Sequence, residues 1–145
     1  MIELTYMPCA VEHLKLIQPV KGLEHEQAVF LSPQYEHIFK NNFSMSAWAG
    51  NKCVCAAGIC PIYSHKAIAW ALMSKDAGPY MRQITAKVKS FLAMDKTPRI
   101  EMLVAADFKA GNKWAKLLGM TQEGPARRMH GPNGEDEIMY VRIKE

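Results

Sequence analysis

The sequence lacks any apolar stretch long enough to cross a lipid bilayer. His, Lys or Glu interrupts every hydrophobic window before it reaches the roughly 18 residues that a spanning helix needs. The opening residues, MIELTYMPCAVEHLK, also lack the basic start and apolar run of a secretory signal. We therefore expect no membrane association and a cytoplasmic protein, in which cysteines stay reduced.

Metal-binding spacing is also missing. The four cysteines are Cys9, Cys53, Cys55 and Cys60, and the run NKCVCAAGIC has neither paired C-x2-C turns nor histidine partners at matching spacing. Cys53 and Cys55 alternate within an apolar run, which predicts that both point to one face of a strand. Because cysteine is among the most frequently buried residue types, we interpret these thiols as core residues and predict no metal site.

The charge pattern carries no sign of nucleic-acid binding. The net charge is +4, but the Lys and Arg residues are spread along the chain and match no basic stripe or known motif. With 49% hydrophobic residues, the composition is that of a globular chain and not of a disordered one. A length of 145 residues suits a single domain spanning positions 1–145.

Hydrophobic periodicity and turn residues predict the order of elements. Val11, Leu14 and Ile17 have helical spacing, and Gly50-Asn51 is a two-residue turn signal between two strand-like runs. The resulting order, β-α-α-β-β-β-α-β-α-β-β, predicts an α+β fold with one parallel crossover and an otherwise antiparallel, mixed sheet. The expected elements are the strand Met1–Met7, the helix Cys9–Ile17, a helical stretch Gly22–Phe39 broken at Pro33, the strands Phe43–Ala49, Lys52–Tyr63 and Ala67–Ser74, the helix Pro79–Met94, the strand Arg99–Ala106, the helix Phe108–Leu118 and a hairpin over Ala126–Lys144.

This order and several segments resemble the GNAT-type N-acetyltransferases. NKWAKLLGMTQEG, at 112–124, is similar to the family's junction of helix, Leu-Gly pair and strand. IEMLVAAD resembles its fifth strand, and AAGICPIY its third. The resemblance covers nearly the whole chain and implies a central mixed sheet with helices on both faces. It extends to small phage-encoded acetyltransferase-like proteins, which would place this chain in a host cytoplasm.

In that family, acyl-CoA lies between the splayed fourth and fifth strands. Its pantetheine arm bonds to the backbone of the fourth strand, and its pyrophosphate meets the N-terminus of the next helix. The resemblance therefore implies acetyl-CoA or another acyl-CoA as co-substrate, without a metal. Ser74 and Tyr80, at the predicted mouth of the cleft, are the candidate catalytic residues. The cofactor-binding residues that the resemblance implies are Leu72, Met73, Ser74, Lys75, Gly78, Tyr80, Met81, Arg82 and Asn112.

The chain departs from the family pattern at two places. The stretch SKDAGPYMRQ has one glycine, Gly78, where the family has more, and Pro79 has no N–H to donate. The position of the tyrosine that protonates the leaving thiolate holds Ala115. The family's asparagine aligns with Phe108, and Asn112 lies one turn further on.

Two functions stay open on these residues. One is an acyl-CoA-dependent N-acyltransferase that moves an acetyl or short acyl group to an amine, of a small molecule or a protein, in a ternary complex. The other is a catalytically eroded module of the same fold that binds a partner protein, for example one of a host. Each candidate side chain also has a plain structural interpretation: Ser74 as a turn residue and Tyr80 as a surface aromatic. A base for the acceptor amine is sought among Glu24, His25, Glu26 and Tyr35, although acidic residues are also ordinary at a helix start.

Overall fold

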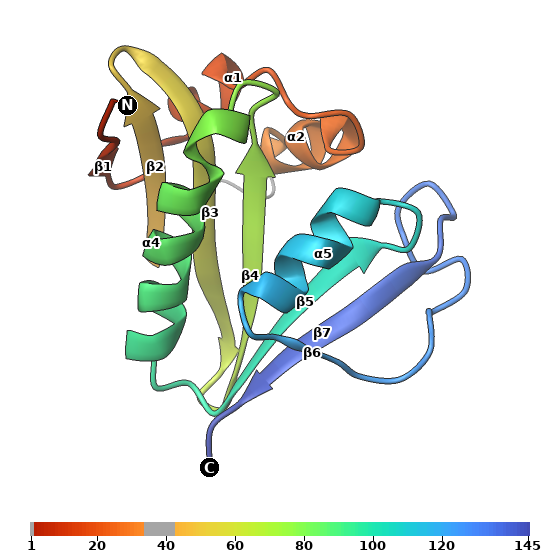
Figure 1. The fold of residues 1–145 in the computed structure, drawn as a ribbon. Coiled ribbons are helices and arrows are strands. Elements are labelled where there is room, and N and C mark those ends of the chain that lie inside the picture. The colour runs from red at the N-terminus through yellow and green to blue at the C-terminus, as the bar shows by residue number, and fades with distance from the viewer. Residues whose placement is uncertain (1, 34–42) are drawn as a thin grey trace. The chain divides into compact units, whose positions relative to one another are not determined.

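The computed structural model describes residues 2–33 and 43–145. Its strands form a mixed sheet of seven strands in the order β1-β2-β3-β4-β5-β7-β6 (Figure 1). The pairing of β4 with β5 is parallel, while β1–β2, β2–β3, β5–β7 and β6–β7 are antiparallel. The predicted α+β fold with a mixed sheet is confirmed. The elements are β1 (Thr5–Met7), α1 (Val11–Leu16), α2 (Glu24–Phe30), β2 (Phe43–Ala49), β3 (Lys52–Tyr63), β4 (Lys66–Met73), the 3-10 turn η2 (Gly78–Tyr80), α4 (Met81–Met94), β5 (Arg99–Ala105), α5 (Lys109–Leu117), β6 (Thr121–Gln122) and β7 (Glu137–Ile143).

The chain divides into two compact units. Unit 1 comprises Met1–Cys60 and Trp70–Lys87, and unit 2 comprises Pro61–Ala69 and Val88–Glu145. Three elements, β3, β4 and α4, pass from one unit into the other. That the whole chain is one domain stays a prediction.

Unit 1 is built around a core between α1 and the strands β3 and β4. Leu14 and Ile17, at 0% and 2% exposure, supply the buried side of α1, as their spacing predicts. Burying one such side chain stabilises the fold by about 1.5–3 kcal/mol. The Gln27 side-chain amide of α2 donates to the carbonyls of Leu14 and Ile17, at 2.8 and 2.6 Å, and so fixes α2 against the end of α1. The buried residues of this cluster are Cys9, Leu14, Ile17, Cys53, Ala56, Trp70 and Leu72.

A β-bulge in β3 changes the direction of one cysteine. Along β2, Ala47 pairs with Cys55 and Trp48 pairs with Cys53, so Val54 is an extra residue in the ladder. Ala47 and Trp48 are neighbours in β2 and therefore face opposite sides of the sheet. Their partners Cys55 and Cys53 face opposite sides as well. Cys53 belongs to the core cluster with α1, and Cys55 does not. The prediction that both point to one face is therefore wrong, because simple alternation takes no account of a bulge.

Unit 2 is built on the pairing of β5 with β7. The register runs over seven residue pairs, from Arg99↔Ile143 to Ala105↔Glu137, and α5 lies across these strands (Figure 1). Tyr140 of β7 is fully buried on the side of the sheet that α5 covers. Arg142 donates to the carbonyls of Leu92, Asp95 and Thr97 and so satisfies the end of α4.

Two predicted segments differ from the structure. The first strand of the predicted last hairpin, at Ala126–His130, is a loop with a single bridge from Arg127 to Glu137, and the strand that precedes β7 and pairs with it is β6. Gly124 and Met129 have φ angles of 80° and 51°, which extended backbone does not allow. The predicted helical stretch Gly22–Phe39 contains α2, and its last part, with Tyr35, lies outside the described residues.

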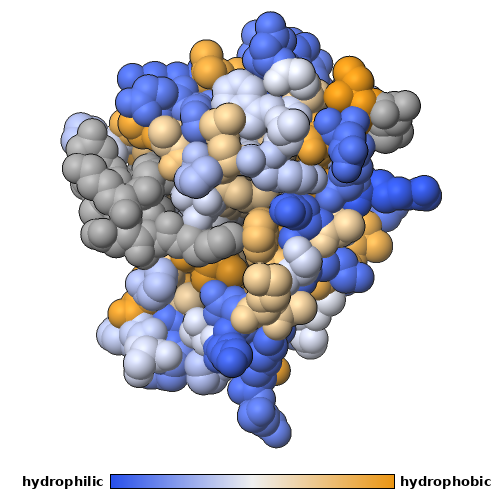
Figure 2. All heavy atoms as spheres, turned by 90° about the vertical axis from the view of Figure 1, so that its left-hand side faces the viewer, coloured by the Kyte–Doolittle hydropathy of each residue, from blue (hydrophilic) through white to orange (hydrophobic). Residues whose placement is uncertain are grey.

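The length and the apolar character of a helix decide whether it can cross a membrane. Across 2–33 and 43–145, no helix combines the length and the apolar character that crossing a membrane takes. On the face seen in Figure 2, hydrophobic residues form separate patches among hydrophilic ones.

Candidate functional site

The end of β4 and the loop into α4 carry most of the predicted site residues. The positions from Leu72 to Arg82 all lie in unit 1, whereas Asn112 lies in unit 2. Leu72 and Met73 are buried, at 0% and 9% exposure, so they present backbone and not side chains to a ligand. Lys75 and Arg82 are exposed and give the loop two cationic side chains.

Ser74 shapes the turn that follows β4. Its N–H donates to the Val54 carbonyl at 2.9 Å, and its side-chain hydroxyl accepts the N–H of Asp76 at 3.0 Å. The Ser74 carbonyl accepts the N–H of Ala77, also at 3.0 Å. With only 4% of its surface exposed, Ser74 has the contacts of a turn residue, and its catalytic role stays a prediction.

A short segment after α1 lies along the edge of β4. The Val20 N–H donates to the Met73 carbonyl at 2.9 Å, and the Lys75 N–H donates to the Gln18 carbonyl at 2.8 Å. Pro19 and Ser74 form an antiparallel bridge between these two bonds. The Met73 carbonyl, predicted to contact pantetheine, is therefore already hydrogen-bonded within the protein. In the sequence, Pro19 indicates only the end of a helix. No hydrophobic periodicity predicts that Pro19 pairs with Ser74.

The loop into α4 uses most of its own backbone donors. A phosphate at a helix start needs N–H groups that point outward without an acceptor. Here η2 tightens the chain into 3-10 geometry with Pro79 in its first turn. A Cβ at exposed Gly78 would have nothing within 4 Å, so the backbone is approachable there. The internal bonds are Lys75 N–H to the Gln18 carbonyl, Asp76 N–H to the Ser74 hydroxyl, Ala77 N–H to the Ser74 carbonyl, Tyr80 N–H to the Ala77 carbonyl and Met81 N–H to the Gly78 carbonyl.

The charged side chains around this loop are largely exposed. Asp76 lies 3.4 Å from the ammonium group of Lys52, and the two side chains are 42% and 60% exposed. An exposed pair of this kind contributes little to stability, but it offsets the negative charge of Asp76 near the loop. Lys87, on α4, lies with its ammonium 4.6 Å from the centre of the Tyr6 ring. Lys75 and Arg82 are thus the loop cations best placed for an anionic ligand.

Asn112 has partners inside unit 2 for both ends of its side-chain amide. Its NH2 group donates to the carbonyls of Ala105 and Phe108, at 3.0 and 2.8 Å. Its oxygen accepts the hydroxyl proton of Tyr140 at 2.7 Å. Asn112 therefore joins the end of β5 to the start of α5. A cofactor contact at this residue stays a prediction, for which the second lone pair of the Asn112 oxygen is available. Ala115, at the position of the family's tyrosine, is fully buried.

Three of the four residues sought as a base for the acceptor amine, Glu24, His25 and Glu26, lie on α2. Glu24 accepts the N–H of Gly22 at 2.9 Å, and backbone hydrogen bonds from Glu24 itself and from Gly22 lower its pKa. This is the ordinary role of an acidic residue at a helix start. The Nε2 atom of His25 is buried and has no hydrogen-bond partner among the described residues. Tyr35 lies outside the described residues.

A polar cluster between α1 and β2 was not anticipated. The Nδ1 atom of His13 accepts the N–H of Ala10 at 3.1 Å and lies 3.1 Å from the Ser46 hydroxyl. That hydroxyl also accepts the indole N–H of Trp48 at 2.9 Å. Ser46 is fully buried, so the cluster holds α1 against β2. An alternating strand pattern does not reveal which polar residue will find partners across the fold.

Three of the four cysteines, Cys9, Cys53 and Cys55, are buried as predicted, and Cys60 is half-buried. Burial raises the pKa of Cys9 to about 12 and that of Cys53 to about 11, and it raises the pKa of Cys55 as well. The described part of the chain contains no group of three His, Cys, Asp or Glu residues arranged to hold a metal ion.

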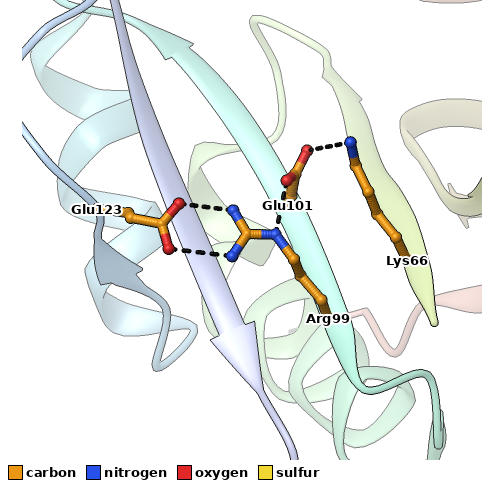
Figure 3. A network of polar contacts seen from close by, with 4 residues as sticks. All are labelled: Lys66, Arg99, Glu101 and Glu123. Atoms are coloured by element: carbon orange, nitrogen blue, oxygen red, sulfur yellow. Dashed lines mark hydrogen bonds and ion pairs between the residues drawn. The ribbon is translucent and has the colours of Figure 1, made fainter.

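A charged network connects three strands of unit 2. Arg99 donates to both carboxylate oxygens of Glu123, at 2.6 and 3.0 Å, and to Glu101 at 2.7 Å (Figure 3). Lys66 lies 3.5 Å from the other oxygen of Glu101. The network links the starts of β4 and β5 to the end of β6 and has the geometry of a structural ion-pair network.

Solved acetyltransferases share this fold. The chain is 14% identical to the ribosomal-protein-S5-alanine acetyltransferase of Vibrio fischeri, with a TM-score of 0.69 and coverage of 100% of this chain and 95% of that one. It is 15% identical to the ribosomal-protein-S18-alanine N-acetyltransferase of Escherichia coli, with a TM-score of 0.71 and coverage of 97% and 94%. A GNAT-family acetyltransferase of Bacillus anthracis gives 13% identity, a TM-score of 0.67 and coverage of 99% and 96%.

These likenesses establish the fold. The chain has the GNAT fold over nearly its whole length, as its element order predicts. Neither the models of known protein families nor the sequences of curated proteins give a match.

Proposed function

We propose that this protein is an acyl-CoA-dependent N-acyltransferase, which moves an acetyl or short acyl group to an amine of a small molecule or a protein. The observation that carries the proposal is the GNAT fold, shared with solved acetyltransferases over 97–100% of this chain. In that fold β4 leads through a short loop into α4, and the same connection is present here from Leu72 to Arg82.

The loop would hold the phosphates of acyl-CoA mainly through side-chain charge. Tyr80 and Met81 use their N–H groups inside η2, so the usual cradle of backbone donors is reduced. The exposed cations Lys75 and Arg82 then supply the attraction, and Gly78 allows close approach because it has no side chain.

Transfer would occur directly in a ternary complex. The amine nitrogen attacks the thioester carbonyl and loses a proton to water, a C–N bond forms, the C–S bond breaks and the thiolate leaves. A backbone N–H of β4 before Ser74 would polarise the carbonyl, as hydrogen-bond donors do when charge develops on oxygen, while the Ser74 N–H stays bonded to Val54. Tyr80, half-buried at the loop, would return a proton to the thiolate, and Ser74 is the second candidate for that proton transfer.

A second function is supported by three observations. The loop donors are used internally, the Met73 carbonyl is bonded to Val20, and Ala115 occupies the place of the family's acid. A module that retains the fold and only binds a partner protein needs no free backbone donors in this loop, no free Met73 carbonyl and no catalytic acid.

Calorimetric titration and thermal unfolding with acetyl-CoA distinguish the two functions. A ligand present at ten times its dissociation constant stabilises the folded state by about 1.4 kcal/mol, which raises the Tm by several degrees. We expect such a rise at millimolar acetyl-CoA, and a loss of most of it in Lys75→Ala/Arg82→Ala. The matched control is Lys113→Ala/Lys116→Ala, which removes two exposed cations of α5. No heat and no rise in Tm at millimolar acetyl-CoA would reject the acyltransferase and leave the binding module.

A further inference from the structure

The loop between β6 and β7 has a fixed conformation of its own. It lies wholly in unit 2, at 123–136. Arg127 and Glu137 form an antiparallel bridge with N–H to carbonyl distances of 2.7 and 3.0 Å. Beyond the bridge, Gly131 donates to the Glu135 carbonyl and Gly134 donates to the Gly131 carbonyl, both at 2.9 Å. The tip is therefore a hydrogen-bonded hairpin loop.

Most carboxylates of this loop are turned toward the loop itself. Glu135 and Asp136 of the loop, and Glu137 at the start of β7, are each close to a donor group of the loop, while Glu123 binds Arg99 of β5. Glu137, at 9% exposure, is also buried. The contacts are Met129 N–H to Asp136 Oδ1 at 3.0 Å, Asn133 N–H to Glu135 Oε2 at 2.9 Å and His130 Nδ1 to Glu137 Oε1 at 2.8 Å.

The arginines and one methionine are turned outward. Arg127 and Arg128 are exposed, and neither side chain forms an ion pair within the described part of the chain. Between them and His130, Met129 is 77% exposed and has a φ angle of 51°. A left-handed conformation costs a non-glycine residue about 1–2 kcal/mol. The loop thus maintains an unfavourable backbone that presents a large apolar side chain to solvent beside two exposed cations, of which Arg127 also attracts the Glu123 carboxylate.

We infer that Arg127, Arg128 and Met129 form a docking surface for an acidic segment of a partner protein, with an apolar side chain among its carboxylates. Arginine binds carboxylates through two parallel hydrogen bonds, and these are strong when both groups are charged. Methionine is flexible and polarisable, so it packs against apolar side chains of different shapes. The three side chains together match a segment in which a leucine-like residue is flanked by Glu or Asp.

The alternatives fit this surface less well. A nucleic acid would satisfy the arginines but leave Met129 in water, and 123–136 contains no Phe, Tyr or Trp on which a base could stack. A second copy of the chain would bring two loops of like charge together. The inferred surface does not depend on acyl transfer, and it gives the partner-binding function a place on the molecule.

The probe is a synthetic fluorescein-labelled peptide in which one leucine stands between two pairs of glutamates. Fluorescence anisotropy should show binding that weakens as salt is added, because charge pairs carry much of it. Amide resonances of 127–130 should shift in the two-dimensional NMR spectrum of the labelled protein. We expect at least a tenfold loss of affinity in Arg128→Glu and a threefold to tenfold loss in Met129→Ala. Replacing the peptide's leucine by serine should reproduce the effect of Met129→Ala.

The matched control is Lys113→Glu, the same charge reversal at an exposed position of α5. It should change the affinity by less than about twofold, the small effect of a charge outside the docking surface. Absence of peptide binding at millimolar concentration, or equal losses in Arg128→Glu and Lys113→Glu, would overturn the inference. Tighter binding of an oligothymidylate or of phosphatidylserine vesicles than of the peptide would overturn it too. None of these results bears on the thermal shift with acetyl-CoA, so the two proposals fail separately.

Discussion

The hydroxyl of Tyr140 donates to the side-chain oxygen of Asn112 across 2.7 Å, and Tyr140 has none of its surface exposed. Burial also raises the pKa of Tyr140, so the hydroxyl stays protonated and remains a donor. The other end of the Asn112 amide holds the carbonyls of Ala105 and Phe108. This pair therefore fixes β7, α5 and the end of β5 to one another.

Tyr140→Phe should destabilise the protein by about 1–2 kcal/mol, because the Asn112 oxygen loses its donor in a place that water does not reach. Urea unfolding followed by circular dichroism measures the difference. Tyr63→Phe is the matched control, since Tyr63 is 61% exposed and should change stability by less than about 0.5 kcal/mol. Equal effects of the two substitutions would contradict a structural role for the hydrogen bond.

The pair of Arg99 and Glu123 should make stability depend on pH in a defined direction. The hydrogen bonds from Arg99 lower the pKa of Glu123 below its ordinary 4.5. A carboxylate whose pKa is lower in the folded state stabilises that state above its unfolded pKa. The contribution is lost as the pH falls through the lowered folded value.

The stability difference between the wild type and Glu123→Gln should therefore be positive at pH 7 and shrink as the pH falls below 4.5. It should also shrink at high salt, because the Glu123 side chain is 45% exposed. Chemical unfolding at several pH values measures this, and Glu12→Gln, an exposed glutamate of α1, controls for loss of a surface carboxylate. A difference that is constant across this range would show that the pair contributes nothing.

Gly111 of α5 has little room for a side chain. A Cβ there would lie 2.6 and 2.8 Å from two ring carbons of Phe108 and 3.0 Å from a methyl of Val104. Gly111→Ala should destabilise the protein by about 1–2 kcal/mol, since overpacking outweighs the better helix propensity of alanine. Thermal unfolding measures the change. Gly78→Ala is the control, because a Cβ there meets nothing within 4 Å, and a larger loss in this variant would contradict the packing argument.

The sequence predicts the elements well where the signal is local. Gly50-Asn51 marks the β2–β3 turn, and Gly119, with a φ angle of 88°, ends α5 where a C-terminal glycine is expected. Pro79 is at the first turn of the short helix that precedes α4. Such features depend on neighbouring residues alone, so a single sequence contains them. The order of elements, and with it the fold, follows from these signals.

The candidate site is less predictable because it depends on contacts between distant segments. The bulge at Val54 arises where β3 pairs with β2. The spacing of Cys53 and Cys55 in the sequence does not predict it. Asn112 is polar and is predicted to contact a cofactor, yet its partners come from β5 and β7. Likewise, the donors of the loop before α4 are satisfied by turns that the spacing of residues does not specify.

The bond from the Val20 N–H to the Met73 carbonyl gives the sharpest test of how acyl-CoA would bind. Without ligand, the amides of Val20 and Lys75 should exchange slowly with deuterium, because both are hydrogen-bonded, at 2.9 and 2.8 Å. The resemblance implies that pantetheine bonds to the backbone of β4. If it does so by taking the place of the segment Gln18–Val20, the bond from Val20 to Met73 is lost. Saturating acetyl-CoA should then increase exchange at Val20 and leave the Ser74 amide, bonded to Val54, protected.

Hydrogen exchange read by NMR at single amides resolves these positions. Rapid exchange at Val20 in the ligand-free protein would contradict the pairing of this segment with β4. Slow exchange at Val20 in a saturated complex would mean that acyl-CoA does not take the place of the segment Gln18–Val20 along β4. The segment Gln18–Val20 would then form part of the wall of the site, and the contacts of the pantetheine arm would lie elsewhere along β4.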